Sequence, residues 1–305
     1  MTKRGKKRST RRWSGFGRDV RYLIDRFSQE DLRTWNRMAD NANRYWVGLY
    51  HHLEAQRQLN RSALIDALAS TSSATIPDTP WYRLVDYAYA LQPLSLLGSL
   101  TQGGRFNVGR DLDATQFPVF PALYLGSGFE TAYAEKFGVV AQCAELAAHE
   151  LALRTPESFA AVRARLRARR LFDLRNAANL TAFASIIRRF RMGAELNALA
   201  KKLGKKPPWL IQNANQLFAV LLATDWRALP IQFGIPANTQ VFAGLLIEAG
   251  FEGVVYPSTK GNGQCVAVFP QNFSDTESSV DLVDALPSAD CQRSLNCESL
   301  DELMH

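Results

Sequence analysis

Four short segments of this 305-residue chain combine residue types that could do chemistry together. Arginine suits a phosphate-bearing ligand, because its planar guanidinium can donate two parallel hydrogen bonds to phosphate oxygens. A Gly-Gly turn lets the backbone approach a ligand closely, since glycine has no Cβ. Each segment also has an ordinary structural interpretation, such as a surface ion pair, a tight turn or a solvated helix face. The segments are Tyr82-Arg83, the Gly-Gly-Arg-Phe-Asn turn at 103–107, Tyr124 with Glu135, and Tyr256-Pro257-Ser258.

Taken in this order, the four segments resemble the RES domain, a family named for its arginine, glutamate and serine. The resemblance covers residues 80–140 and 215–273. It implies a fold similar to that of ADP-ribosylating toxins and an enzyme that degrades NAD by hydrolysis or phosphorolysis. The best-known family members are toxins of bacterial toxin–antitoxin pairs. The resemblance therefore also implies an Xre-type antitoxin as a partner.

The resemblance assigns the family arginines to Arg83 and Arg105, the tyrosine to Tyr124, the glutamate to Glu135 and the serine to Ser258. The spacing of the tyrosine and the glutamate looks like the family spacing. Two intervals depart from the family pattern. The glutamate-to-serine interval is longer than in compact members, and an extra stretch precedes the tyrosine. Both departures bear on substrate choice or regulation.

Two neighbouring residues are further candidates. Asn107 ends the Gly-Gly-Arg-Phe-Asn turn and could also bind the substrate. Glu130 is a rival to Glu135, because it lies five residues earlier and begins the same expected helix.

The chemistry that the resemblance implies suits these residue types. Arg83 and Arg105 would hold the pyrophosphate of NAD, Tyr124 would stack on a flat ring with its hydroxyl available, and Ser258 would bind the ribose or a phosphate. Glu135 would stabilise the positive charge that develops on the ribose as the C1′–N bond breaks. We therefore expect Glu135, Arg83 and Ser258 to be catalytic. NAD is then a substrate, with water or inorganic phosphate as the acceptor, and no cofactor is expected.

Histidine and cysteine are too scattered to predict a metal site. The four cysteines form no C-x-x-C pair, and the four histidines include only one adjacent pair, His51-His52. The same cysteine usage predicts free thiols in a reducing cytoplasm. The longest apolar runs, such as 241–249, are too short to span a membrane.

The net charge of +7 is unevenly distributed along the chain. Residues 1–12 contain seven Lys or Arg and no acid, whereas residues 274–305 contain eight acids and one arginine. Most of the remaining excess lies in 151–206, with fourteen Lys or Arg against three acids. Such a basic region could attract nucleic acid, an acidic protein or a phosphate-bearing ligand, although a solvated surface is the simplest interpretation.

The elements that must position the candidate residues indicate an α+β fold. Apolar residues at helical spacing predict helices over 14–70, and Leu, Ala and Arg runs predict a helical block at 141–214. Short strands are expected at 82–85, 122–125, 253–256 and 266–269, with helices at 128–137 and 238–249. Together with the resemblance, this predicts an ADP-ribosyltransferase-like core with a large helical insertion.

The expected domain organisation has four parts. They are a disordered basic tail (1–13), an N-terminal helical region (14–75), a RES-type catalytic domain (76–273) with the helical insertion at about 141–214, and a disordered acidic tail (274–305).

Several alternatives remain open at this point. The same fold could transfer ADP-ribose to a macromolecule. The basic tail and the arginines of 163–170 could bind nucleic acid, although no nucleic-acid-binding motif is present. The helical regions could bind an antitoxin or form a homo-oligomer. Tyr82, Tyr256 and Trp226 are interpreted as structural aromatic residues.

Overall fold

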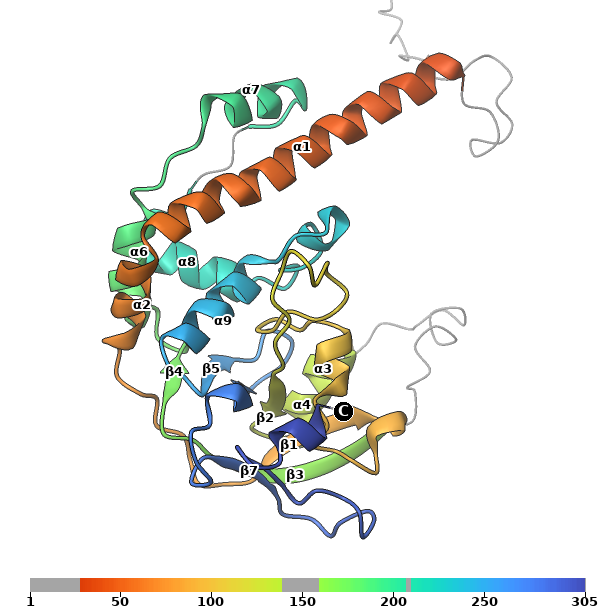
Figure 1. The fold of residues 1–305 in the computed structure, drawn as a ribbon, viewed down its shortest axis with the longest axis vertical. Coiled ribbons are helices and arrows are strands. Elements are labelled where there is room, and N and C mark those ends of the chain that lie inside the picture. Colours follow the sequence, from red (N-terminus) through yellow and green to blue (C-terminus); the bar gives the residue numbers. More distant parts are fainter. Residues whose placement is uncertain (1–27, 139–158, 207–209, 305) are drawn as a thin grey trace, which may run out of the picture. The chain divides into compact units, whose positions relative to one another are not determined.

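The computed structural model describes residues 28–138, 159–206 and 210–304 (Figure 1). The expected basic tail at 1–13, the first part of the N-terminal helical region and the first part of the expected insertion lie outside these residues. The described residues divide into two compact units. The smaller unit extends to Leu49 and includes 193–206, and the larger unit contains all six candidate site residues.

The smaller unit contains the first part of helix α1 (Gln29–Leu59) and helix α7 (Ala194–Lys202). Glu30 and Asp31 lie in the first turn of α1, where carboxylates interact favourably with the helix dipole. Tyr45 is buried in this unit.

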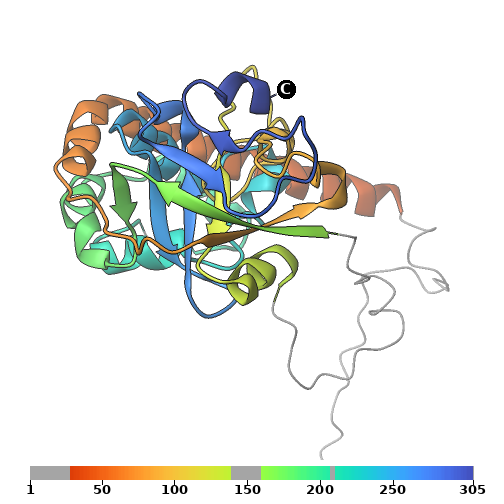
Figure 2. The same cartoon turned by 90° about the horizontal axis from the view of Figure 1, so that it is seen from below.

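The described part of the larger unit forms one eight-stranded sheet in the order β4-β5-β6-β2-β1-β3-β7-β8. Strands β4 and β5 are parallel, and all other neighbouring pairs are antiparallel. Figure 2 shows β3 running beside β1 and β7. The strands are β1 (Trp81–Asp86), β2 (Leu123–Gly126), β3 (Phe159–Arg167), β4 (Leu171–Asp173), β5 (Gly253–Pro257), β6 (Gln264–Val268), β7 (Ser279–Leu282) and β8 (Ser294–Leu295).

Helices and short 3₁₀ turns connect these strands. The α-helices are α2 (Arg61–Ala69), α3 (Leu97–Thr101), α4 (Phe129–Phe137), α6 (Thr181–Ile187), α8 (Ala214–Leu221), α9 (Asn238–Glu248) and α10 (Leu300–Leu303). The 3₁₀ turns are η1 (Tyr87–Tyr89), η2 (Ala177–Leu180), η3 (Pro230–Phe233) and η4 (Pro270–Asn272).

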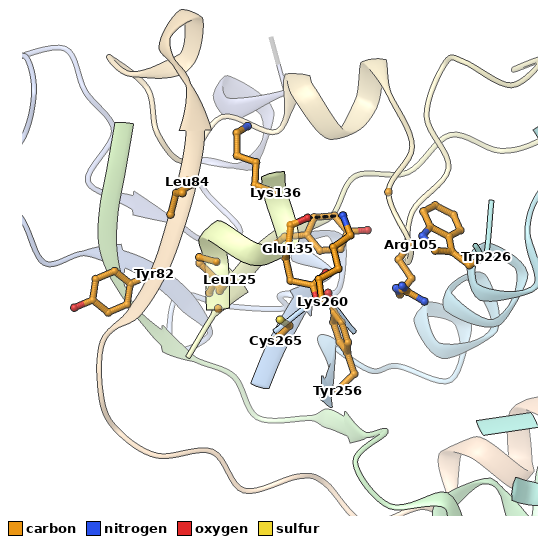
Figure 3. Close-up of a pocket in the computed structure, with 14 residues that line it drawn as sticks. Tyr82, Leu84, Arg105, Leu125, Glu135, Lys136, Trp226, Tyr256, Lys260 and Cys265 are labelled. Carbon is orange, nitrogen blue, oxygen red and sulfur yellow. Dashed lines mark hydrogen bonds between the residues drawn. The ribbon is translucent and has the colours of Figure 1, made fainter. Parts of the chain in front are cut away.

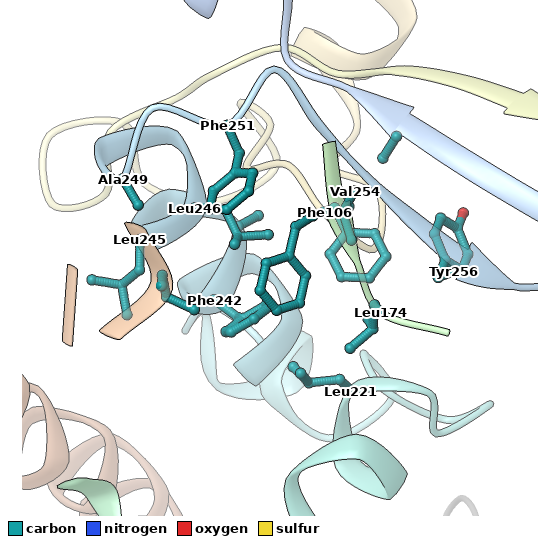
Figure 4. Close-up of a cluster of buried hydrophobic side chains, with 14 of the residues drawn as sticks. Phe106, Leu174, Leu221, Phe242, Leu245, Leu246, Ala249, Phe251, Val254 and Tyr256 are labelled. Atoms are coloured by element: carbon teal, nitrogen blue, oxygen red, sulfur yellow. The ribbon is translucent and has the colours of Figure 1, made fainter. Parts of the chain in front are cut away.

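Each face of the sheet carries its own hydrophobic core. Because side chains alternate along a strand, Val254 and Tyr256 of β5 pack into one core while Val255 packs into the other. The first core also contains Phe106 and side chains of α2, α6, α8 and α9 (Figure 4). The second contains Trp81 and side chains of β3, β7 and β8.

The α+β fold class is confirmed, with helices and strands combined in the larger unit. The strands expected at 82–85, 122–125, 253–256 and 266–269 are β1, β2, β5 and β6, and the helices expected at 128–137 and 238–249 are α4 and α9.

The helical insertion expected at 141–214 is wrong over part of its length, because β3 and β4 lie within it. The remaining described elements in this range are η2, α6 and α7. In β3 the buried Ala164 and Leu166 alternate with exposed Arg163, Arg165 and Arg167. This period of two is the strand pattern, and it overrides the helix preference of Ala, Leu and Arg.

The disordered acidic tail expected at 274–305 is also wrong. This segment forms β7, β8 and α10, and Val280, Leu282 and Leu295 are buried. Strand β7 pairs with β3, so Asp281 lies close enough to form an ion pair with Arg167. Two of the acids in this segment, Asp281 and Asp284, are instead partners of arginines on β3.

Candidate functional site

A pocket of about 300 Å³ opens in the larger unit at the end of α4 and the β5–β6 connection. Figure 3 shows Glu135 and Lys260 together in it, with Arg105 and Trp226 next to each other. Its lining comes from β1, the turn at 103–107, β2, α4, the segment after α8, β5 and β6. The lining residues are Tyr82, Leu84, Gly104, Arg105, Tyr124, Leu125, Gly126, Ala132, Glu135, Lys136, Trp226, Tyr256, Lys260 and Cys265.

Glu135 is held by one of its two carboxylate oxygens. Its Oε1 accepts hydrogen bonds from Ser258 Oγ at 2.6 Å and from the Thr259 backbone N–H at 2.7 Å. Within the described chain, its Oε2 accepts no hydrogen bond, so this oxygen is available to a ligand. The rival Glu130 is exposed on the same helix and lies outside the pocket lining.

Ser258 is oriented by its own turn. Its Oγ accepts the Gly261 backbone N–H at 3.0 Å while it donates to Glu135. Two residues further on, Lys260 donates from Nζ to the Glu135 backbone carbonyl at 2.9 Å. The structure brings Ser258 beside Glu135, and its hydroxyl donates to the carboxylate. Ser258 positions Glu135 and does not line the pocket itself.

Arg105 is only 6% exposed and donates to neutral acceptors. Its Nη1 donates to Leu221 O at 3.0 Å and Ala223 O at 2.8 Å, and its Nη2 donates to Thr259 Oγ1 at 2.9 Å. Burial lowers the pKa of the guanidinium from its ordinary value. The arginine nonetheless remains a cation, since a free guanidinium titrates far above neutral pH.

Tyr124 and Asn107 belong to the same network. The Tyr124 hydroxyl donates to Asn107 Oδ1 at 2.8 Å and accepts the Phe106 N–H at 2.9 Å. Asn107 Oδ1 also accepts the Gly104 N–H, and a Cβ at Gly104 would lie 2.5 Å from the Tyr124 hydroxyl. The Tyr124 hydroxyl therefore already has two hydrogen-bond partners, whereas the sequence analysis expects it to be available to a ligand. Asn107 shapes the turn and is not among the lining residues.

Arg83 is not brought to the site. Tyr82 and Leu84 line the pocket, and the intervening Arg83 points to the other face of the sheet, as strand alternation requires. Its Nη2 donates to Ser95 O at 2.7 Å, and its Nε has no partner among the described residues. Burial lowers the pKa of this guanidinium to about 10. The structure therefore does not bring Arg83 into this pocket, and its roles in substrate binding and catalysis stay predictions.

The floor of the pocket is formed by two buried groups that titrate well above neutral pH. Burial and the nearby Glu135 raise the pKa of the Cys265 thiol to about 12. Burial also raises the pKa of the Tyr256 hydroxyl well above its ordinary value. Both groups are therefore neutral at physiological pH, and the charges of the pocket come from Glu135 and its basic lining residues.

The sequence analysis does not assign six polar or aromatic lining residues to the site: Tyr82, Lys136, Trp226, Tyr256, Lys260 and Cys265. Trp226 was interpreted as a core or interface residue, yet its ring lies 5.6 Å from the Arg105 guanidinium carbon. Two signals could have found the lysines. Lys136 directly follows Glu135, and Lys260 lies two residues after Ser258.

The described ranges contain neither a metal-binding cluster nor a membrane-spanning helix. There, no group of three or more His, Cys, Asp or Glu side chains could hold a metal ion. No helix within those ranges is both long and apolar enough to cross a membrane.

Comparisons with known proteins complete the description. A chain of the M. tuberculosis MbcT–MbcA toxin–antitoxin complex, known from a crystal structure, is similar to this chain at 16% identity with a TM-score of 0.41. That alignment covers 79% of this chain and 96% of the other. The comparison with curated proteins gives no match. The RES domain model matches residues 80–288, which is more than half of the chain, and the protein therefore belongs to the RES domain family.

Proposed function

We propose that this protein consumes NAD by breaking the bond between nicotinamide and its ribose. The observation that carries the proposal is the carboxylate of Glu135, which is anchored through one oxygen and available through the other. It lies in a pocket that also offers an excess of cations and four aromatic rings, those of Tyr82, Tyr124, Trp226 and Tyr256. Membership of the RES domain family supports the same activity.

The bond cleavage needs stabilisation of positive charge. As the C1′–N bond breaks, its electron pair moves to the pyridinium nitrogen, and nicotinamide leaves as a neutral molecule. Positive charge then develops on the ribose, and a carboxylate beside C1′ stabilises it. Water or inorganic phosphate forms the new bond to C1′. Hydrolysis gives ADP-ribose, whereas phosphorolysis gives ADP-ribose 1″-phosphate.

The remaining lining residues suit the rest of NAD. Asp86 pairs with Lys136, so Arg105 and Lys260 are the two cations that the pocket sets against the carboxylate of Glu135, which favours a pyrophosphate. Trp226 and the ring of Tyr124 offer flat apolar surfaces to a nicotinamide or adenine ring. In this proposal Ser258 and Asn107 position Glu135 and the turn, and Arg83 takes no part in binding.

We further propose a toxin that acts on cytoplasmic NAD and is restrained by an Xre-type antitoxin. Family membership supports this proposal, because it is the best-known role of RES domains. The excess of cations in the pocket would suit an inhibitory segment that carries a carboxylate.

The test is the loss of NAD in the presence of the purified protein, with and without inorganic phosphate, with product masses as the readout. The Glu135→Gln variant should reduce turnover by about 10²–10³-fold, since it removes the charge that stabilises the ribose cation. Glu130→Gln is the matched control, because it makes the same change on an exposed part of the same helix. No NAD loss by the folded native protein would contradict the proposal. Label from NAD found on a macromolecule would indicate ADP-ribosyl transfer instead.

A further inference from the structure

Two segments of the larger unit, the turn at 103–107 and the residues after α8, are joined by two arginines. Each segment contributes one arginine, which donates to backbone carbonyls of the other segment or the end of α8. From the turn at 103–107, Arg105 donates to the backbone carbonyls of Leu221 and Ala223. From the segment after α8, Arg227 Nη1 donates to the Gly103 carbonyl at 2.7 Å. Each segment thus supplies a side chain to the backbone of the other, across more than a hundred residues of sequence.

Asp111 binds both partners of the second connection, Arg227 and Gly103. Its Oδ2 forms an ion pair with Arg227 Nη2, and its Oδ1 accepts the Gly103 backbone N–H at 2.8 Å. Both hydrogen-bonding groups of Gly103 are therefore used, one by each member of the ion pair. A Cβ at this position would lie 2.9 Å from Gln240 Nε2, so the turn has room only for glycine here.

Trp226 lies close to both arginines. The guanidinium carbons of Arg105 and Arg227 are 5.6 Å and 5.9 Å from the centre of its ring. Figure 3 shows Trp226 beside Arg105 at one end of the pocket. Asp111 neutralises Arg227, whereas the hydrogen-bond partners of Arg105 among the described residues are neutral. The ring of Trp226 is thus close to one cation that is paired with a carboxylate and to one that is not.

We propose that Asp111 and Arg227 are positioning residues for the substrate-binding end of the pocket. They hold the turn at 103–107 against the segment that carries Trp226, and they set the separation of Arg105 and Trp226. Neither residue lines the pocket, so both act through the residues that do. The inference rests on the proposed function, because it assumes that Arg105 and Trp226 contact NAD.

The position of Glu135 predicts whether KM or kcat changes when Asp111 or Arg227 is substituted. Its carboxylate is held by the Ser258 hydroxyl and the Thr259 backbone N–H, which belong to neither of the two connected segments. Arg105 contacts this turn through the Thr259 side chain, not through the N–H that holds Glu135. Loosening the Asp111–Arg227 pair should therefore weaken NAD binding while leaving the reacting end nearly intact. A general loss of folding would instead lower the amount of active enzyme without raising KM.

The first experiment compares KM and kcat for NAD in Arg227→Lys, Asp111→Asn and Arg61→Lys. Lysine keeps the charge at 227 but cannot donate through a fork to both Asp111 and Gly103. We expect KM to rise about tenfold in the first two variants, with kcat within about threefold of the native value. Arg61→Lys is the matched control, since it alters the Arg61–Glu248 pair between α2 and α9, away from the pocket.

A second measurement needs no turnover. The difference in fluorescence between each protein and its Trp226→Phe derivative reports the environment of Trp226 alone. We expect acrylamide to quench Trp226 more strongly in Arg227→Lys than in the native protein, and ADP-ribose to protect it less. Asp111→Asn should show the same changes, and thermal unfolding shows that each variant is folded.

The two proposals fail in different ways. If the native protein does not consume NAD, the proposed function fails, while the quenching experiment still tests the positioning role. If KM and Trp226 quenching stay within twofold of the native values in folded Arg227→Lys and Asp111→Asn, the positioning role is overturned.

Discussion

The arginines on β3 and the arginine in the pocket differ in what they bind. On β3 and just after it, exposed arginines form ion pairs with carboxylates of other segments. These pairs are Arg163–Asp284, Arg165–Asp78, Arg167–Asp281 and Arg169 with Asp275 and Glu277. In the pocket, Arg105 donates instead to two backbone carbonyls and one hydroxyl.

This difference distinguishes arginines that stabilise the fold from an arginine whose charge can bind a ligand. A carboxylate cancels the charge of its arginine, whereas a carbonyl dipole orients the arginine and leaves its net charge in place. The arginines on β3 and Arg169 just after it are therefore neutralised by carboxylates, although they belong to the most basic part of the sequence. Arg105 in the pocket has no carboxylate partner among the described residues.

The comparison predicts its largest effect at Arg105. Replacing the unpaired cation in Arg105→Met should lower kcat/KM for NAD by about 10²-fold, because the charge that would meet the pyrophosphate is lost. The same change in Arg167→Met should leave kcat/KM within about twofold, because Asp281 already neutralises that charge. Steady-state kinetics of the two variants test this directly, and equal losses would break the comparison.

Two lysines repeat the contrast inside the pocket. Lys260 donates to the Glu135 carbonyl, whereas Lys136 forms an ion pair with Asp86 at 2.5 Å. Lys260→Met should raise KM for NAD or for phosphate about tenfold, and Lys136→Met should change both by less than about threefold. A larger effect at Lys136 than at Lys260 would show that pairing with a carboxylate does not decide which cation binds the ligand.

Arg83 should behave as a structural residue in spite of its place in the family pattern. Arg83→Met leaves the Ser95 carbonyl without its donor, which costs about 1–3 kcal/mol of folding free energy. KM for NAD should stay within about twofold, because the side chain lies on the face of the sheet opposite the pocket. Chemical unfolding and steady-state kinetics on the same preparation separate the two effects. A rise in KM without a loss of stability would contradict the position described above.

The smallest effect is expected for nucleic-acid binding by β3. Arg165→Ala combined with Arg167→Ala should leave the affinity for a DNA duplex and its salt dependence unchanged, because both arginines are already paired. Fluorescence anisotropy over a salt series measures this. A slope that falls by about one for each arginine removed would show that these side chains contact phosphates.

The sequence predicts the central elements well because their patterns are short and unambiguous. The run Val254-Val255-Tyr256 has few interpretations other than a buried strand, and Glu135 and Ser258 meet because α4 and β5 flank the same end of the sheet. By contrast, the strand Trp81–Asp86 is apolar on both faces around a single arginine. Its residue types do not show on which face of the sheet Arg83 lies. The sequence therefore could not predict which face of this strand lines the pocket.

Long-range pairing explains the other differences. The arginines of β3 resemble a helix surface until the acids of β7 are placed beside them, and those acids resemble a disordered tail until β3 is placed beside them. Each segment is interpretable only with its partner. Trp226 is a similar case, since its place in the pocket depends on Arg105, which lies 121 positions earlier in the sequence.

The distance along the chain between the two halves of the pocket has a consequence for protein synthesis. Ser258 meets Glu135 across 123 residues, and Thr259 meets Arg105 across 154. At a translation rate of about 5–20 residues per second, Glu135 is made about 6–25 seconds before the groups that hold it. A chain still on the ribosome therefore has a carboxylate without its anchor. We expect a producing cell to begin losing NAD only after complete molecules are released, and this delay gives a partner made at the same time an opportunity to bind first.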